Sequence, residues 1–459
     1  MAIIGLIFSP ALLGFFSGDD WAVMRVSEIK SPGEFLNFFS LIPTTQSLTF
    51  YRPLPQQIFF FVFHRLFGLN PFPYYLCVLA CFLLSLYFLY RLAIKLKFSH
   101  LQSLLTVLFY GVAVANFARI YFLSAFQDVL LPLFVILSLL TYIDKKISLS
   151  ILFFVLALLS KETAVVIPPL IFWLILYSGG KHFVKLIPYF VILALYLFFR
   201  LKFFGGAAGD SYLWDFSITK VLNTFLWYCL WAIGTPEIMV DYVGSGLRIV
   251  PKFFTDFPVW NKIILLELGS LFISLIAQIA FYFKEFTKKS GLVIFCLFFF
   301  LISLSPVIFM PWHKFSHALS LPMVGSSLLL GYFFSKPKLL TKIFITLYLV
   351  TNISMMLFMY PRFYSVNRGK ISRLVYEFFS KNYPLPPGDS YFLFVNDPTG
   401  YKGGEDQSKE LSLALSSSDF FQIFYRDPDY RAYFVDLHES IPLSGKTVPI
   451  DSGQFLRRY

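Results

Sequence analysis

The chain has 459 residues, of which 57% are hydrophobic and 14% charged, and its mean hydropathy is +0.70. Soluble domains carry about 25% charged residues, so the composition excludes an ordinary soluble protein and predicts an all-α polytopic membrane protein. The net charge of +12 does not indicate nucleic-acid binding. The basic residues lie in short loops between apolar runs and lack the interleaved aromatic residues of a nucleic-acid surface.

A helix needs about 17–25 mostly apolar residues to cross a bilayer. We accept shorter runs where the flanking charges alternate, and this predicts about eleven transmembrane helices. They cover residues 3–16, 73–94, 101–121, 128–143, 148–160, 163–178, 183–203, 261–283, 290–310, 316–334 and 338–359. The first run lacks the basic segment and the cleavage site of a signal peptide, so we expect it to be retained.

Lysines and arginines occur in alternate loops, after the second, fourth, sixth, eighth and tenth predicted spans. These residues are Arg91, Lys95, Lys97, Lys145, Lys146, Lys181, Lys185, Lys284, Lys288, Lys289, Lys336, Lys338 and Lys342. Short loops rich in Lys and Arg are cytoplasmic. The pattern therefore predicts a multi-pass membrane protein with a cytoplasmic N-terminus and the C-terminus outside.

The first outer loop, residues 17–72, begins with the acidic pair Asp19-Asp20 directly after an apolar run. An apolar wall raises the pKa of a carboxylate, and a carboxylate in this place can act as a general base toward a hydroxyl or amine. Equally, the pair can end the span and cap the following helix. Both interpretations stay open at this point.

Residues 52–67 of the same loop are apolar but contain charged side chains, so we expect an interfacial helix in contact with membrane lipids. If this helix crossed the membrane, the basic loop that follows would lie outside. Arg52 either binds a phosphate oxygen or lies at the level of the lipid headgroups. Arg119 and Asp128, at the outer ends of the third and fourth spans, are weaker site candidates.

Lys161 and Glu162 form an outward turn between two short apolar runs. A Lys–Glu pair at the edge of the hydrocarbon is costly unless it is paired or occupied by a ligand. The alternative is an ordinary solvated hairpin turn. We favour a functional role, because the short flanking runs place the turn within the bundle.

The second long outer loop, residues 204–260, contains an apolar stretch at 221–233 that the parity of the basic loops makes interfacial or re-entrant. A further outward turn carries Lys314 between His313 and His317. One cation with two histidines suits a phosphate, although Trp and Lys are also common anchors at the membrane interface. No zinc motif accompanies the histidines.

From residue 360 the character of the chain changes. We expect residues 1–359 to form a transmembrane module and residues 360–459 a small mixed α/β extracytoplasmic domain. Residues 390–395 and 432–435 have strand patterns, and residues 410–425 have a helical one.

The order of these motifs resembles the membrane glycosyltransferases of the GT-C superfamily. That group includes protein O-mannosyltransferases, tetratricopeptide-bearing mannosyltransferases and bacterial aminoarabinose transferases. The similarity covers residues 1–335 and rests on the acidic pair together with Tyr51-Arg52-Pro53-Leu54, Gly68-Leu69-Asn70-Pro71, Asp128-Val129-Leu130-Leu131 and Leu158-Leu159-Ser160-Lys161-Glu162-Thr163.

The resemblance implies a sugar donor carried on a polyprenyl phosphate and a lipid, glycan or protein acceptor. Asp19 would take the acceptor proton, with Asp20 assisting. The donor phosphate would be bound by Lys161, Arg52 and Lys314, and the donor sugar oriented by Glu162, His313, His317, Arg119 and Asp128. Some members use a divalent metal and others do not, so a metal cofactor stays an open alternative.

We therefore predict an inverting membrane glycosyltransferase of the cell inner membrane that acts on the outer face of this membrane. A transporter or flippase for a lipid-linked or anionic solute ranks second, because it would need polar residues near the middle of the membrane and often internal repeats. A non-catalytic assembly protein that displays the C-terminal domain is a third alternative.

Overall fold

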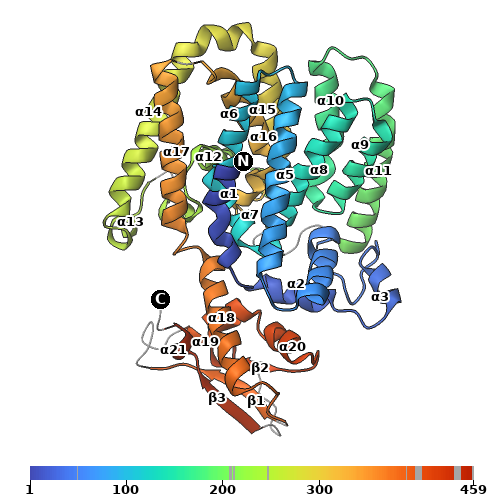
Figure 1. The fold of residues 1–459 in the computed structure, drawn as a ribbon, viewed down its shortest axis with the longest axis vertical. Coiled ribbons are helices and arrows are strands. Elements are labelled where there is room, and N and C mark those ends of the chain that lie inside the picture. Colours follow the sequence, from blue (N-terminus) through green and yellow to red (C-terminus); the bar gives the residue numbers. More distant parts are fainter. Residues whose placement is uncertain are drawn as a thin grey trace.

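The computed structural model describes residues 1–48, 50–205, 209, 212–244, 248–336, 338–388, 390–398, 406–438 and 446–456. Figure 1 shows a bundle of helices and, below it, a small α/β part that one long helix, α18 (Tyr364–Asn382), connects to the bundle. We call the chain from α18 onward the C-terminal unit. The first outer loop folds into α2 (Asp19–Ser27), α3 (Pro32–Asn37) and α4 (Phe59–Phe67).

The bundle is built from apolar helices that pack around one hydrophobic core. They are α1 (Ala2–Phe8), α5 (Phe72–Lys95), α6 (His100–Gly111), α7 (Phe117–Tyr121), α8 (Gln127–Ile143), α9 (Ile147–Leu158), α10 (Ile167–Tyr177), α11 (Ile187–Phe199), α12 (Ile218–Ile233), α13 (Lys252–Asp256), α14 (Trp260–Lys288), α15 (Ser290–Leu304), α16 (Pro322–Phe333) and α17 (Leu339–Met359).

All the predicted spans coincide with helical segments, but fewer are long enough to cross a membrane alone. Five are long and apolar enough by length and composition: Phe72–Lys95, Leu123–Ile143, Phe183–Phe204, Trp260–Lys288 and Leu339–Asn382. A bent pair of helices makes up to six. The remaining predicted spans are shorter apolar helices, so the full count stays a prediction.

The predicted third span is broken rather than continuous. It bends by 57° between α6 and the helical segment that leads into α7. The side chain of Asn116 donates hydrogen bonds to the carbonyls of Tyr110 and Gly111 at 2.7 and 3.1 Å, which lie at a helix end where intrahelical partners are missing. The side chain of Asn352, on α17, accepts the Val114 N–H at 2.8 Å. These bonds stabilise the bend.

Ion pairs connect the loops that the charge pattern groups on one side. Lys95 pairs with Asp144, and Lys336 pairs with Glu285. Each pair joins two of the basic loops that we predicted to be cytoplasmic. The structure therefore agrees with the grouping of the loops, while the orientation in the membrane stays a prediction.

The C-terminal unit contains a parallel three-stranded sheet of order β2-β1-β3. Its strands are β1 (Ser390–Val395), β2 (Ala432–Phe434) and β3 (Lys446–Asp451). The first two lie where the sequence predicted strands. The predicted helix over 410–425 is instead two helices, α19 (Gln407–Leu415) and α20 (Asp419–Tyr425), and the short helix α21 (Gly453–Leu456) follows β3.

Helix α2 is attached directly to the C-terminal unit. The Trp21 ring packs edge-on against Phe420 at 4.9 Å between centroids, and its indole N–H donates to the Ser372 hydroxyl at 3.3 Å. The Gly18 N–H donates to the Ala414 carbonyl at 2.7 Å. The acidic pair and the C-terminal unit therefore lie at the same end of the bundle (Figure 1).

Candidate active site

The two carboxylates of the acidic pair have different surroundings. Asp20 is fully buried and accepts three hydrogen bonds, from the Ser17 N–H at 2.9 Å and from the N–H and hydroxyl of Ser124 at 2.8 and 2.6 Å. Burial raises the pKa of Asp20 to about 7, although the hydrogen bonds act in the opposite direction. Protein groups therefore occupy both oxygens of Asp20, and the bonds from Ser124 connect the start of α2 to the segment before α8.

Asp19 is the first residue of α2, and the left-handed conformation of Gly18 before it (φ 50°) turns the chain into the helix. Its side chain is exposed, and no described residue forms a hydrogen bond with it. Surrounding protein still raises the pKa of this carboxyl by burial, while the charge of Arg368 lowers it. An accessible carboxylate with a raised pKa is suited to accept a proton.

Arg52 and Glu162 form a two-pronged ion pair. The Nε and Nη2 groups of Arg52 donate to the two carboxylate oxygens of Glu162 at 2.8 and 2.5 Å, and the guanidinium also lies 4.3 Å from the centre of the Phe50 ring. Burial alone would raise the pKa of Glu162, but Arg52 overcomes it and lowers the pKa to about 2. Glu162 therefore stays ionised, and it holds Arg52 rather than the neighbouring Lys161.

Lys161 pairs with Asp128 instead. Its Nζ lies 2.6 Å from Oδ1 of Asp128, and both side chains are almost completely buried. The Ser320 hydroxyl lies 3.4 Å from the same oxygen, whereas Oδ2 of Asp128 has no hydrogen-bond partner among the described residues. Two adjacent residues of the turn at 160–163 therefore form ion pairs with different partners.

Arg119 is fully buried and is held by protein groups. It donates to the Asp128 carbonyl at 3.0 Å, to the Tyr110 hydroxyl at 3.2 Å and to the side chain of Asn116. These bonds position the start of α8. The structure does not bring Arg119 to the accessible space beside Asp19.

The turn that carries the two histidines lies next to these ion pairs. The His313 ring is centred 4.0 Å from the Tyr212 ring. Burial, together with the charges of Lys161 and Arg52, lowers the pKa of His313 to about 4, so this ring is neutral at physiological pH. The His317 ring stacks on Phe315 at 5.3 Å.

The side chain of Lys314 has different neighbours from the side chains of the two histidines. Its Nζ donates to the side-chain oxygen of Asn223 at 3.0 Å. Burial and the nearby charge of Lys220 lower the pKa of Lys314. Two close lysines favour an anion between them.

Tyr212 lies within electrostatic range of Asp19 and of the ion pair between Arg52 and Glu162. Burial raises the pKa of Tyr212, and the charges of Arg52, Glu162 and Asp19 are all close enough to shift it. We call Arg52, Asp128, Lys161, Glu162 and His313 the polar cluster. Asp19 and two members of this cluster, Arg52 and Glu162, lie within electrostatic range of Tyr212. The sequence patterns did not single out Tyr212, because an isolated aromatic residue in a loop gives no signal.

Glu237 is a second residue that the sequence analysis missed. It is buried and accepts the Ser316 N–H at 2.7 Å, which joins the second long outer loop to the histidine turn. Burial raises the pKa of Glu237, against the effect of the bond from Ser316. A carboxylate directly after the apolar stretch 221–233 repeats the pattern of the acidic pair, and this signal was available.

The described residues contain no group of three or more His, Cys, Asp or Glu side chains that could hold a metal ion. Asp19, Asp20 and the other predicted site residues do not form such a group. The dependence on a divalent metal therefore stays a prediction with both alternatives open.

Residues 52–201 match the model of the family described as dolichyl-phosphate-mannose-protein mannosyltransferase. No curated protein and no solved structure shows a significant match to the chain. The matched region contains Arg52, Asp128, Lys161 and Glu162, while Asp19 precedes it and His313 follows it. The match covers less than half of the chain, and it supports the similarity to the membrane glycosyltransferases of the GT-C superfamily that the sequence motifs indicated.

Proposed function

We propose that the protein transfers a sugar from a polyprenyl-phosphate donor to an acceptor on the outer face of the membrane, with inversion at the anomeric carbon. The observation that carries this proposal is that a carboxylate without a partner in the described chain, Asp19, and a cation with a fixed partner, Arg52, both lie within electrostatic range of Tyr212. Asp19 offers a carboxylate that no described residue occupies, and Arg52 is a cation fixed by Glu162. A base and a fixed cation are the two groups that the reaction needs.

In the proposed reaction, the acceptor hydroxyl gives its proton to the carboxylate of Asp19 while its oxygen bonds to the anomeric carbon. The bond between that carbon and the phosphate oxygen breaks, and polyprenyl phosphate leaves with the electron pair. Attack from the side opposite to the leaving group inverts the anomeric carbon. An acceptor amine would react in the same way.

The leaving phosphate gains negative charge, so fixed donors directed at it accelerate the step. Glu162 uses Nε and Nη2 of Arg52, and within the described chain no group accepts a hydrogen bond from Nη1. The two N–H bonds of Nη1 are therefore available to a phosphate oxygen. Lys161, which is paired with Asp128, contributes a second positive charge. Lys314 is a further candidate for binding the phosphate.

Glu162 acts in this proposal by orienting Arg52. His313 is neutral, so it can exchange hydrogen bonds with a sugar hydroxyl without adding charge. Its Nδ1 is buried and lacks a partner among the residues that the structure describes. Asp20 and Arg119 keep α2 and α8 in position.

The test is sugar transfer from a radiolabelled polyprenyl-phosphate-sugar pool in membranes that carry wild type or Asp19→Asn at matched expression. A general base contributes about 100-fold to 10,000-fold, so we expect transfer to fall by at least about 100-fold. Label in the lipid, glycan or protein fraction would identify the acceptor class.

Glu377→Gln is the matched control, because Glu377 is an exposed carboxylate on α18. It should transfer sugar at the wild-type rate. Equal transfer by Asp19→Asn and Glu377→Gln would overturn the assignment of the base.

A further inference from the structure

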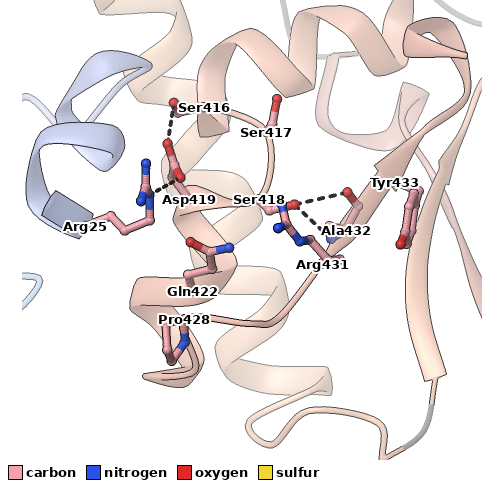
Figure 2. A pocket seen from close by; sticks show the side chains of 10 residues that line it. All are labelled: Arg25, Ser416, Ser417, Ser418, Asp419, Gln422, Pro428, Arg431, Ala432 and Tyr433. Carbon is pink, nitrogen blue, oxygen red and sulfur yellow. Dashed lines mark hydrogen bonds and ion pairs between the residues drawn. The ribbon is translucent and has the colours of Figure 1, made fainter. Parts of the chain in front are cut away.

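A cavity of about 690 Å³ lies between α2 and the C-terminal unit (Figure 2). Arg25 from α2 forms one side, and residues from the turn before α20 and from the start of β2 form the other. No member of the polar cluster lines it. Its volume is within the range of small-molecule sites, about 300–1,000 Å³.

The charged groups of the lining favour an anion. Arg25 and Arg431 each bring one positive charge, and Asp419 brings one negative charge. Asp419 pairs with Arg25 at 2.5 Å, whereas Arg431 is exposed and forms no ion pair with any residue in the described ranges. Guanidinium groups bind phosphate and carboxylate groups through two parallel hydrogen bonds. The lining therefore keeps one positive charge available for a ligand.

The uncharged groups of the lining favour a hydroxylated ligand. The turn from Ser416 to Ser418 contributes three hydroxyls, and Gln422 contributes an amide. Each of these groups also forms a hydrogen bond within the protein, so a ligand would use their remaining hydrogen-bonding capacity. Ser416 and Ser417 both have φ of 54°, a conformation that residues other than glycine rarely adopt and that is concentrated at functional sites. Tyr433 adds an aromatic ring to the same wall, which can cover an apolar face of a sugar ring.

The place of the cavity connects it with the proposed base. Arg25 lies six residues after Asp19 in the same helix, which corresponds to about 9 Å along the helix axis. The interactions of Trp21 with Ser372 and Phe420 fix this helix to the C-terminal unit. A ligand bound in the cavity is therefore held at a constant position relative to Asp19.

We propose that this cavity binds an anionic saccharide, which is the part of the acceptor that the enzyme recognises. Arg431 and Arg25 bind the phosphate or carboxylate group, and the serine turn and Gln422 bind ring hydroxyls. The acceptor role rests on the proposed glycosyltransferase function, whereas the binding of an anionic saccharide does not.

The test is direct binding to the full chain in detergent, measured by isothermal titration calorimetry with glucose 6-phosphate as the probe. Glucose and inorganic phosphate are measured as separate arms. We expect glucose 6-phosphate to bind more tightly than either, and Arg431→Gln to weaken its binding at least tenfold. Lys446→Gln is the matched control, because Lys446 is an exposed cation of the same unit outside the cavity.

Arg431 makes no ion pair that its replacement would break within the described chain, so Arg431→Gln should fold like the wild type. Arg25→Gln, which also removes the pair with Asp419, should weaken binding as well. Equal binding by Arg431→Gln and Lys446→Gln, no binding of the sugar phosphate, or equally tight binding of glucose or of phosphate alone would each overturn the proposal. Sugar transfer is not measured here, so a failure of this test is distinct from a failure of the Asp19→Asn test.

Discussion

Replacement of Asp20 by asparagine separates the tasks of the two neighbouring carboxylates. The substitution keeps the size of the side chain but exchanges one acceptor oxygen for an NH₂ donor. Three donor groups, from Ser17 and Ser124, point at the two oxygens of Asp20. In either orientation of the asparagine amide, its NH₂ group faces a backbone N–H.

A buried N–H that loses its acceptor costs about 1–3 kcal/mol. We therefore expect Asp20→Asn to lower the free energy of unfolding by about 1–3 kcal/mol. Asp19→Asn removes no hydrogen bond to a described residue, and its side chain is exposed. Its effect on stability should stay within about 0.5 kcal/mol.

The assay compares the midpoints of thermal denaturation of the detergent-solubilised proteins and the transfer rate of the folded fraction. We expect Asp20→Asn to denature at a lower temperature and to keep transfer activity per folded molecule. Asp19→Asn should keep the midpoint and lose transfer. If Asp20→Asn kept the wild-type midpoint and lost transfer, Asp20 would be the base and the reasoning would be refuted.

Three more results are expected. Arg52→Lys should reduce transfer by about 100-fold, since lysine lacks the fork that binds Glu162 and leaves Nη1 for phosphate; a rate near wild type in the same radiolabel assay would contradict this. Transfer should fall with decreasing pH through a pKa above the ordinary 3.8 of an aspartate, because Asp19 must be ionised and burial raises its pKa; Glu377→Gln should show the same profile. The folded protein keeps a proton on Asp20 up to about pH 7, whereas the unfolded chain loses it near pH 3.8. The free energy of unfolding should therefore decrease as the pH rises between these values. A difference in this free energy between wild type and Asp20→Asn that did not change with pH would contradict the prediction.

Patterns local in the chain predicted most of the helices and two of the three strands. The strand β3 was missed because Pro449 interrupts its pattern, and proline normally excludes a central strand. In the sheet order β2-β1-β3, however, β3 is an edge strand, where a missing N–H is tolerated. The bend after Gly111 was missed because its cause is the side chain of Asn116 in an otherwise apolar run.

The sequence predicted which residues belong to the candidate site better than it predicted which of them form ion pairs with each other. Arg52 and Glu162 are separated by 110 residues, and Lys161 and Asp128 by 33. Such pairs depend on how α8 and α9 pack against the first outer loop, which no local pattern contains. Adjacency suggested that Lys161 and Glu162 form a pair with each other, and the structure gives each of them another partner.

The attachment of α2 to the C-terminal unit also has a consequence for the order of synthesis. Trp21 and Ser372, which share a hydrogen bond, are separated by 351 residues. At about 5–20 residues per second, the ribosome needs about 20–70 s to make the intervening chain. During this time Trp21 lacks Ser372 and Phe420, so the attachment of α2 to the C-terminal unit forms only when translation is nearly complete, whereas the bonds of Asp20 with Ser17 and Ser124 can form earlier. A chain terminated before residue 372 could contain every member of the polar cluster and still lack the attachment of the Asp19 helix to the C-terminal unit.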